Sequence, residues 1–194
     1  MRHATLPTTV AALLLPLALA PARAAEQTLT FDPVRSKIEI RLGATGHDVD
    51  GSFALRSGSL RFDATTGAAN GEVIVDLATG QTGSGSRDAT MKEDVLETAR
   101  FPVATLRAAR ISGNLAATGT SDVTLEGTLS VHGTDHAVSI PAHVTIDGAH
   151  FAATAEFAVP FLSWGMKDPS ILFLRVDKVV QVKLTADGQL TATP

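Results

Sequence analysis

The chain has 194 residues, with 16 Lys and Arg against 20 Asp and Glu and a formal net charge of −4 at pH 7. This mildly acidic balance excludes the basic face that nucleic-acid binding needs, so no nucleic-acid partner is expected. The chain has no cysteine, which excludes disulfides and thiolate metal sites and leaves stability to the hydrophobic core.

The first 24 residues have the pattern of a secretory signal peptide. Arg2 and His3 form a short basic start, an apolar run follows from Val10 to Ala20, and Ala22-Arg23-Ala24 has the small residues of a cleavage site. The alternative, an uncleaved anchor, needs a longer uninterrupted apolar run to span a membrane. We therefore expect residues 1–24 to be removed and residues 25–194 to form one domain.

Alternation of apolar and polar residues predicts β-strands along most of the remaining chain. The first clear case is Lys37–Leu42, in which every second residue is apolar, a period that places these side chains on one face. The same pattern recurs over residues 60–62, 73–77, 123–131, 138–146, 151–159 and 180–184. Tight-turn signals such as Asp147-Gly148 separate the runs, so we predict an antiparallel sandwich or barrel with one apolar interior.

One stretch, residues 86–98, breaks this alternation and predicts a single short helix. Its apolar residues at helical spacing are Met91, Val95 and Leu96. Thr90 and Glu93 fit a capping box at the helix start, and Phe101-Pro102 would end the helix because Pro disfavours helical backbone before it.

Several local motifs occur in a fixed order along the chain. They are His47 with Gly51 and Phe53, Arg87-Asp88, Leu96, Phe101-Pro102, and Gly127-Thr128-Leu129 with His132-Gly133. Together they resemble the YceI-like family of periplasmic polyisoprenoid-binding proteins, over a region from about Phe31 to Gly188. The segment Val159–Met166 departs from the commoner family pattern, in which an Arg and an aromatic precede Phe-Gly.

The resemblance implies an all-β fold, an extended eight-stranded antiparallel lipocalin-like barrel with one short helix near one end. It also implies a periplasmic location and a polyisoprenoid, quinone-like or other long-chain amphiphile held inside the barrel. An eight-stranded barrel has room either for its own side chains or for one small ligand, so such a ligand is sterically possible.

A lipid site needs apolar walls and few polar groups. The wall residues expected from the pattern are Phe53, Leu60, Phe62, Val75, Leu106, Phe157 and Leu172, with Met91 and Leu96 closing one end. Trp164, the only tryptophan, lies in a loop and is expected at the barrel mouth. The alternative for each of these residues is that it only fills a core.

His47 and Arg87 are candidates to contact the polar head of the ligand. For Arg87 and its neighbour Asp88, a structural role at the helix start is an alternative, because a carboxylate is favoured there. His132 and His136 flank a predicted turn, but no third ligand occurs at a suitable spacing, so neither a metal site nor a cofactor is expected.

The favoured function is therefore a carrier or reservoir for a long-chain lipid rather than an enzyme. No Gly-x-Ser-x-Gly motif, cysteine or tyrosine is present to supply a nucleophile. One alternative is an enzyme that acts on such a lipid in the same cavity, with His47 or the His132/His136 pair as acid, base or metal ligand. Another is a soluble partner of a cytochrome b-type membrane electron-transport protein, and a homodimer through a free sheet edge remains open.

Overall fold

The computed structural model describes residues 26–171 and 175–193. The predicted signal peptide and Leu172 lie outside the described residues. The strands are β1 Glu26–Phe31, β2 Lys37–Leu42, β3 Val49–Asp63, β4 Ala69–Gln81, β5 Val103–Gly113, β6 Gly119–Val131, β7 Thr134–Asp147, β8 His150–Val159 and β9 Val180–Thr193. A helical segment between β4 and β5 consists of α1 Gly85–Thr90 and the π-helical turn η1 Met91–Val95.

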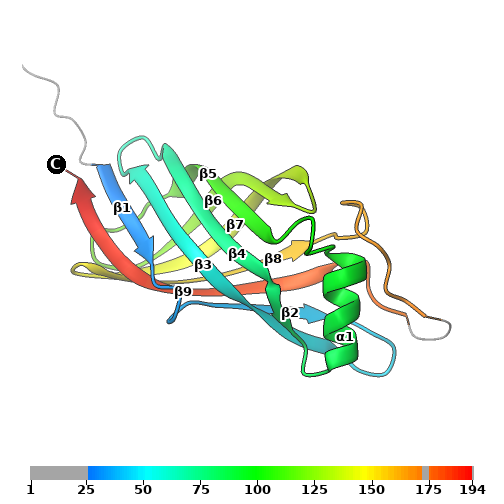
Figure 1. Ribbon diagram of the computed structural model, residues 1–194. Helices are drawn as coiled ribbons and strands as arrows, with labels where there is room; N and C mark the ends of the chain where they lie inside the picture. Colours follow the sequence, from blue (N-terminus) through cyan, green and yellow to red (C-terminus); the bar gives the residue numbers. More distant parts are fainter. Residues whose placement is uncertain (1–25, 172–174, 194) are drawn as a thin grey trace, which may run out of the picture.

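The strands form one closed antiparallel barrel (Figure 1). From β3 to β9 each strand pairs with the next, and β9 closes the sheet on both β1 and β2, which in turn both pair with β3. Because β1 and β2 are two halves of one interrupted position, the nine strands occupy eight positions around the barrel. The predicted eight-stranded antiparallel barrel with one short helix is confirmed.

The alternation seen in the sequence sets which residues face inward. In β7, Ile140, Val144 and Ile146 are buried, whereas the residues between them, such as His143 and Thr145, are exposed. The β6–β7 hairpin turns on His132 and Gly133, which both have positive φ angles of 51° and 73°, as a two-residue hairpin of this twist requires.

The helix differs from its prediction at both ends. It begins at Gly85, with Ser84 as the N-cap, so Thr90 lies inside it with helical angles and no capping bond; the predicted capping box is wrong. The helix ends at Val95, because Glu97 takes a positive φ of 46° well before Pro102.

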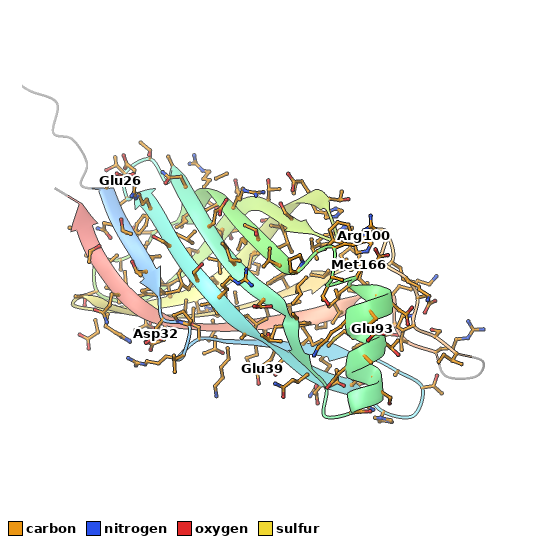
Figure 2. All side chains as sticks on the ribbon, viewed as in Figure 1. Glu26, Asp32, Glu39, Glu93, Arg100 and Met166 are labelled. Atoms are coloured by element: carbon orange, nitrogen blue, oxygen red, sulfur yellow. The ribbon has the colours of Figure 1, made fainter. Side chains whose placement is uncertain are left out.

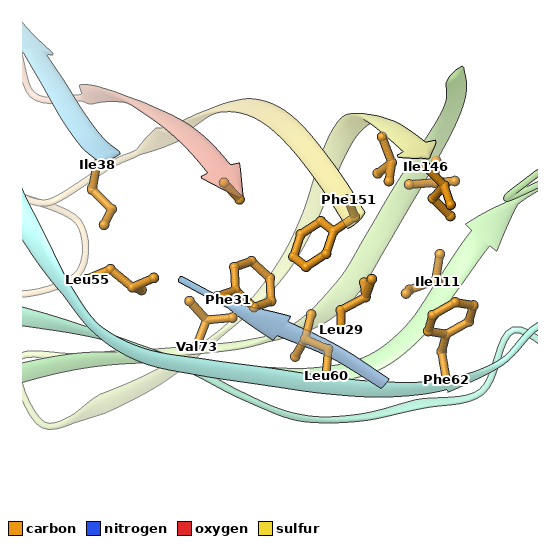
Figure 3. Packing of buried hydrophobic residues seen from close by; sticks show 13 residues of the cluster. Leu29, Phe31, Ile38, Leu55, Leu60, Phe62, Val73, Ile111, Ile146 and Phe151 are labelled. Atoms are coloured by element: carbon orange, nitrogen blue, oxygen red, sulfur yellow. The ribbon is translucent and has the colours of Figure 1, made fainter. Parts of the chain in front are cut away.

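The main cluster of the core fills the half of the barrel where β1 begins and β9 ends (Figure 3). Its buried members are Leu29, Phe31, Ile38, Leu55, Leu60, Phe62, Val73, Ile111, Val123, Val144, Ile146, Phe151 and Ala186. Phe151 is only 1% exposed and meets Phe31 edge to face, with ring centroids 5.2 Å apart. This part of the interior is densely filled by side chains.

The helix-end cluster occupies the opposite end, under the helix and the long β8–β9 connection (Figures 1 and 2). Its buried members are Leu77, Val95, Ala104, Val131, Val159, Phe161 and Met166. Only Val95 of this group comes from the helix, so the helix covers this end of the barrel and adds little to its core.

Candidate functional site

Between the two clusters lies a middle section of the interior in which side chains face inward but remain partly accessible. Phe53, Val75 and Val182 pack against both clusters and are only half-buried. Their chain neighbours on either side point outward, as the alternation of β3, β4 and β9 requires. Inward-facing side chains that keep accessible surface show that the packing is looser here than in the main cluster.

A glycine brings the helix close to this section. A methyl group added at Gly80 would lie 2.6 Å from Met91 Cε and 2.6 Å from Phe53 Cε1, closer than real side chains approach. Because Gly80 has no side chain, Met91 of the helix and Phe53 of β3 can both pack over β4 at this point. Two of the predicted wall residues are brought together in this way.

The structure places the other predicted wall residues in three settings. Leu60 and Phe62 are buried in the main cluster, with 4% and 2% of their surface exposed, and so act as ordinary core. Leu106 is half-buried against the same cluster and lies next to Val73 across the β4–β5 pair. Phe157, Leu96 and Trp164 are half-buried against the helix-end cluster.

The buried residues of the described part of the chain are mostly apolar. Ser36, Thr105 and Ser121 are the buried polar residues there, and no buried residue is charged. Two depressions lie on the outer surface, one beside Asp122 and His143 and the other beside Lys92 and Arg100.

Two aromatic contacts lie at the helix end of the barrel. The His136 ring stacks on the Trp164 indole, with centroids 3.9 Å apart and an interplanar angle of 4°. On the neighbouring turn, the His132 ring lies 4.8 Å from that of Phe101, and its Nε2 is 3.7 Å from a carboxylate oxygen of Glu97. His132, which lies in the turn and was predicted to flank it, and His136, which follows on β7, thus have different surroundings.

The two predicted head-group residues lie away from the interior. His47 is exposed in the β2–β3 connection. Arg87 is also exposed, and its guanidinium donates to the Thr82 carbonyl oxygen at 3.0 Å. Asp88 accepts from the Thr82 N–H at 2.7 Å and from its hydroxyl at 2.6 Å, and these hydrogen bonds lower the pKa of the Asp88 carboxyl. Arg87 and Asp88 therefore link the end of β4 to the helix. This is the structural role that stood as the alternative to a contact with the head of the ligand.

The predicted set of wall residues left out four apolar residues that pack against the two clusters, Leu125, Leu129, Val182 and Leu184. His136 was considered only with His132, as an acid, base or metal ligand, and not as a contact for the head of the ligand. For the four apolar residues the signal was available, because all lie in runs of alternating hydrophobicity. His136 gave no such signal, because its place depends on the contact with Trp164, which lies 28 residues further along the chain.

The described residues contain no group of three or more His, Asp or Glu arranged to hold a metal ion. Nor does any described helix have the length and apolar character needed to cross a membrane. Each described strand pairs with a neighbour on both sides over at least part of its length. The β7–β8 register covers only Ala142–Asp147 of β7, so the first part of β7 pairs with β6 alone, and the homodimer stays a prediction.

Comparison with known proteins identifies the family. A model of the YceI-like domain matches residues 29–187. The chain belongs to the YceI-like domain family. The resemblance indicated by the sequence motifs is thus confirmed. A relative of this YceI-like chain, a UPF0312 protein of Shewanella denitrificans, is 29% identical over 186 residues, which cover 88% of this chain and 92% of the relative.

Solved structures share the YceI-like fold at low sequence identity. A polyisoprenoid-binding domain of Saccharophagus degradans, implicated in plant cell wall breakdown, has a TM-score of 0.66 and 16% identity, covering 85% of this chain and 98% of that one. BcnA of Burkholderia cenocepacia has a TM-score of 0.63 and 18% identity, covering 81% and 99%. The YCEI protein of Campylobacter jejuni has a TM-score of 0.51 and 13% identity, covering 97% and 98%.

Proposed function

We propose that this YceI-like protein binds a long-chain isoprenoid or similar amphiphile in the middle section of the barrel, as a carrier or reservoir and without catalysing a reaction. The observation that carries the proposal is the partly accessible apolar stretch at Phe53, Val75 and Val182, which lies between the main cluster and the helix-end cluster. A ligand there meets only apolar walls. Its affinity comes from burial of hydrocarbon rather than from charge pairing.

The comparisons support the class of ligand. The structural neighbour from Saccharophagus degradans is described as a polyisoprenoid-binding domain, and it shares the fold over most of this chain. The signal-peptide pattern of residues 1–24 further supports export of the protein, and we propose a periplasmic location.

The expected energetics favour long chains over short ones. Each buried CH₂ contributes about 0.8 kcal/mol, so a few isoprene units offset the cost of association without any charged contact. Affinity should therefore increase with chain length until the chain exceeds the interior. Binding would also restore contacts that the half-buried side chains of the middle section lack in the free protein.

The arrangement of the histidines supports binding rather than catalysis. An enzyme acting in the same interior needs an acid or base that reaches the ligand. His47 is exposed outside the barrel, and His132 is held by Phe101 and Glu97. Neither is placed to act on a chain lying between Val75 and Val182. His136, the other member of the pair, stacks on Trp164, and its Nε2 atom has no acidic partner among the described residues that would make it an acid–base pair.

The experiment is to express residues 25–194 and to measure bound small molecules by native and denaturing mass spectrometry. A long-chain apolar species at about one per chain, or uptake of added polyprenol at that ratio, supports the proposal. An empty protein that takes up no polyprenol, while folded by circular dichroism, contradicts it. A variant with Gln181→Phe, at an exposed residue of β9, controls for lipid that adheres to the outer surface.

A further inference from the structure

The described residues contain three buried side-chain atoms without a hydrogen-bond partner, and two of them belong to groups with an evident partner. His132 Nε2 lies 3.7 Å from a carboxylate oxygen of Glu97. The Oδ1 atom of Asp187 is unpaired, but the Oδ2 atom of that carboxylate contacts both Arg35 and His150 at 3.0 Å. The remaining atom is His136 Nε2, which has no hydrogen-bond partner among the described residues.

His136 has its ring fixed in place. It lies on β7 two residues before Val138 and four before Ile140, so it belongs to the inward-facing set, and it is paired across the sheet with Leu129. Stacking on Trp164 fixes the plane of the ring. Trp164 itself is held in the β8–β9 connection, where its backbone N–H donates to the Pro160 carbonyl oxygen at 3.2 Å and its side chain packs on the helix-end cluster.

A buried polar atom without a partner costs about 1–3 kcal/mol and calls for an explanation such as a bound ligand. His136 stacks on Trp164 and pairs across the sheet with Leu129, and both of these residues pack against the helix-end cluster. A lipid whose hydrocarbon lies in the barrel could therefore bring a polar group to His136 at this end. A neutral imidazole nitrogen can donate to or accept from a hydroxyl or carbonyl oxygen. The cations Arg100 and Lys167, which follow the helix and Trp164 in the chain, are already paired, with Glu97 and Asp94.

We infer that His136, held by Trp164, binds the neutral oxygen-bearing head of the lipid, a hydroxyl or a carbonyl, at the helix end of the barrel. The inference rests on the proposed function, since it assumes that the lipid chain occupies the interior. His136 thus takes the place of His47 and Arg87 as the residue expected to contact the polar head of the lipid. It also gives the ligand a direction, with its head toward the helix and its tail toward the main cluster.

The test compares two lipids and three proteins. The lipids are a polyprenol and the hydrocarbon of the same chain length that lacks the hydroxyl, presented from identical micelles. The proteins are the wild type, the His136→Phe variant, which keeps an aromatic ring for stacking, and a His143→Phe variant, which removes an exposed histidine of the same strand. Trp164 fluorescence reports binding, and side-chain ¹⁵N shifts of histidine report the hydrogen bond.

We expect the wild type and the His143→Phe variant to bind polyprenol about fivefold to tenfold more tightly than the hydrocarbon. The His136→Phe variant should lose this preference and keep its hydrocarbon affinity, and the His136 ¹⁵N shifts should change when polyprenol binds. A preference that survives His136→Phe would overturn the inference and leave the proposed function intact, as would tighter binding of polyprenyl phosphate than of polyprenol. Failure of the wild type to bind either lipid would overturn both.

Discussion

The two ends of the barrel interior are built from similar residue types but are packed differently. In the main cluster, Phe151, Ile146 and Phe62 are at most 2% exposed. At the helix end, the most buried members, Leu77, Phe161 and Met166, are each 5% exposed. Phe157, Leu96 and Trp164 are half-buried against them. Apolar side chains at the two ends therefore have different roles. The main cluster holds the fold together, and the helix end leaves apolar surface that a ligand can cover.

The largest expected effect on stability separates two phenylalanines of the same strand. Phe151→Ala removes a fully buried ring that contacts Phe31, and should lower the free energy of unfolding by about 3–5 kcal/mol. Phe157→Ala removes a half-buried ring and should cost about half as much, because less surface leaves water on folding. Urea unfolding of both variants measures the difference. Equal losses would contradict the division of the interior into two regions.

A smaller effect is expected when the middle section is filled. Val182→Phe adds a ring to the interior and should displace about two CH₂ groups of a bound chain, which weakens polyprenol binding about tenfold. Gln181→Phe adds the same ring to the outside of the same strand and should leave binding unchanged. A titration followed by Trp164 fluorescence gives both affinities. Equal binding by the two variants would mean that the ligand lies elsewhere.

Two hairpin turns offer a comparison of two glycines, Gly148 between β7 and β8 and Gly133 between β6 and β7. Gly148→Ala places a side chain at a φ of 59° with no atom within 4 Å, and should cost about 1 kcal/mol of stability through backbone strain alone. Gly133→Ala has a similar φ of 73°, and its methyl group would also lie 2.6 Å from the Phe101 ring. It should therefore be the more destabilising of the two in thermal unfolding. The reverse order would show that the Phe101 ring can move aside without a cost in stability.

The smallest effect concerns the attachment of the helix to β4. The hydrogen bonds from Thr82 lower the pKa of Asp88, so the stability they contribute is present above the ordinary Asp pKa of about 3.9 and is lost as the pH falls through the lowered value. Asp88→Asn should reduce stability slightly at pH 7. The difference from the wild type should shrink below about pH 4. A difference that does not change with pH would show that the charge of Asp88 is not involved.

Most of the fold could be predicted from the sequence, because alternation and turn residues act locally. Runs such as that of β7 indicated both the strands and their inward faces. The turn signal at Gly133-Thr134-Asp135 predicted the β6–β7 hairpin, although the turn itself is formed by His132 and Gly133. The helix boundaries could not be predicted, since Thr90 fits a capping box but the Asp88–Thr82 contact allows the helix to begin earlier. The family resemblance, and not the alternation, indicated a closed barrel.

The candidate site was predicted less well, because it depends on contacts between distant parts of the chain. Apolar character identified Phe53 and Val75, but it could not separate them from Leu60, which is ordinary core. The polar residues chosen by motif, His47 and Arg87, lie on the outside of the protein. The pairing of His136 with Trp164 is a tertiary contact that no local pattern encodes.

The most direct test of the central claim is methyl NMR of the valine and leucine side chains during a titration with polyprenol. The account predicts that the methyl signals of Val75 and Val182 shift as the lipid binds. The signals of Leu29 and Leu60 in the main cluster should change little, and those of Val34, which is 90% exposed outside the barrel, should not move. Shifts confined to Val34 and other outer residues, at a lipid concentration that saturates binding, would contradict the claim that the lipid lies inside the barrel.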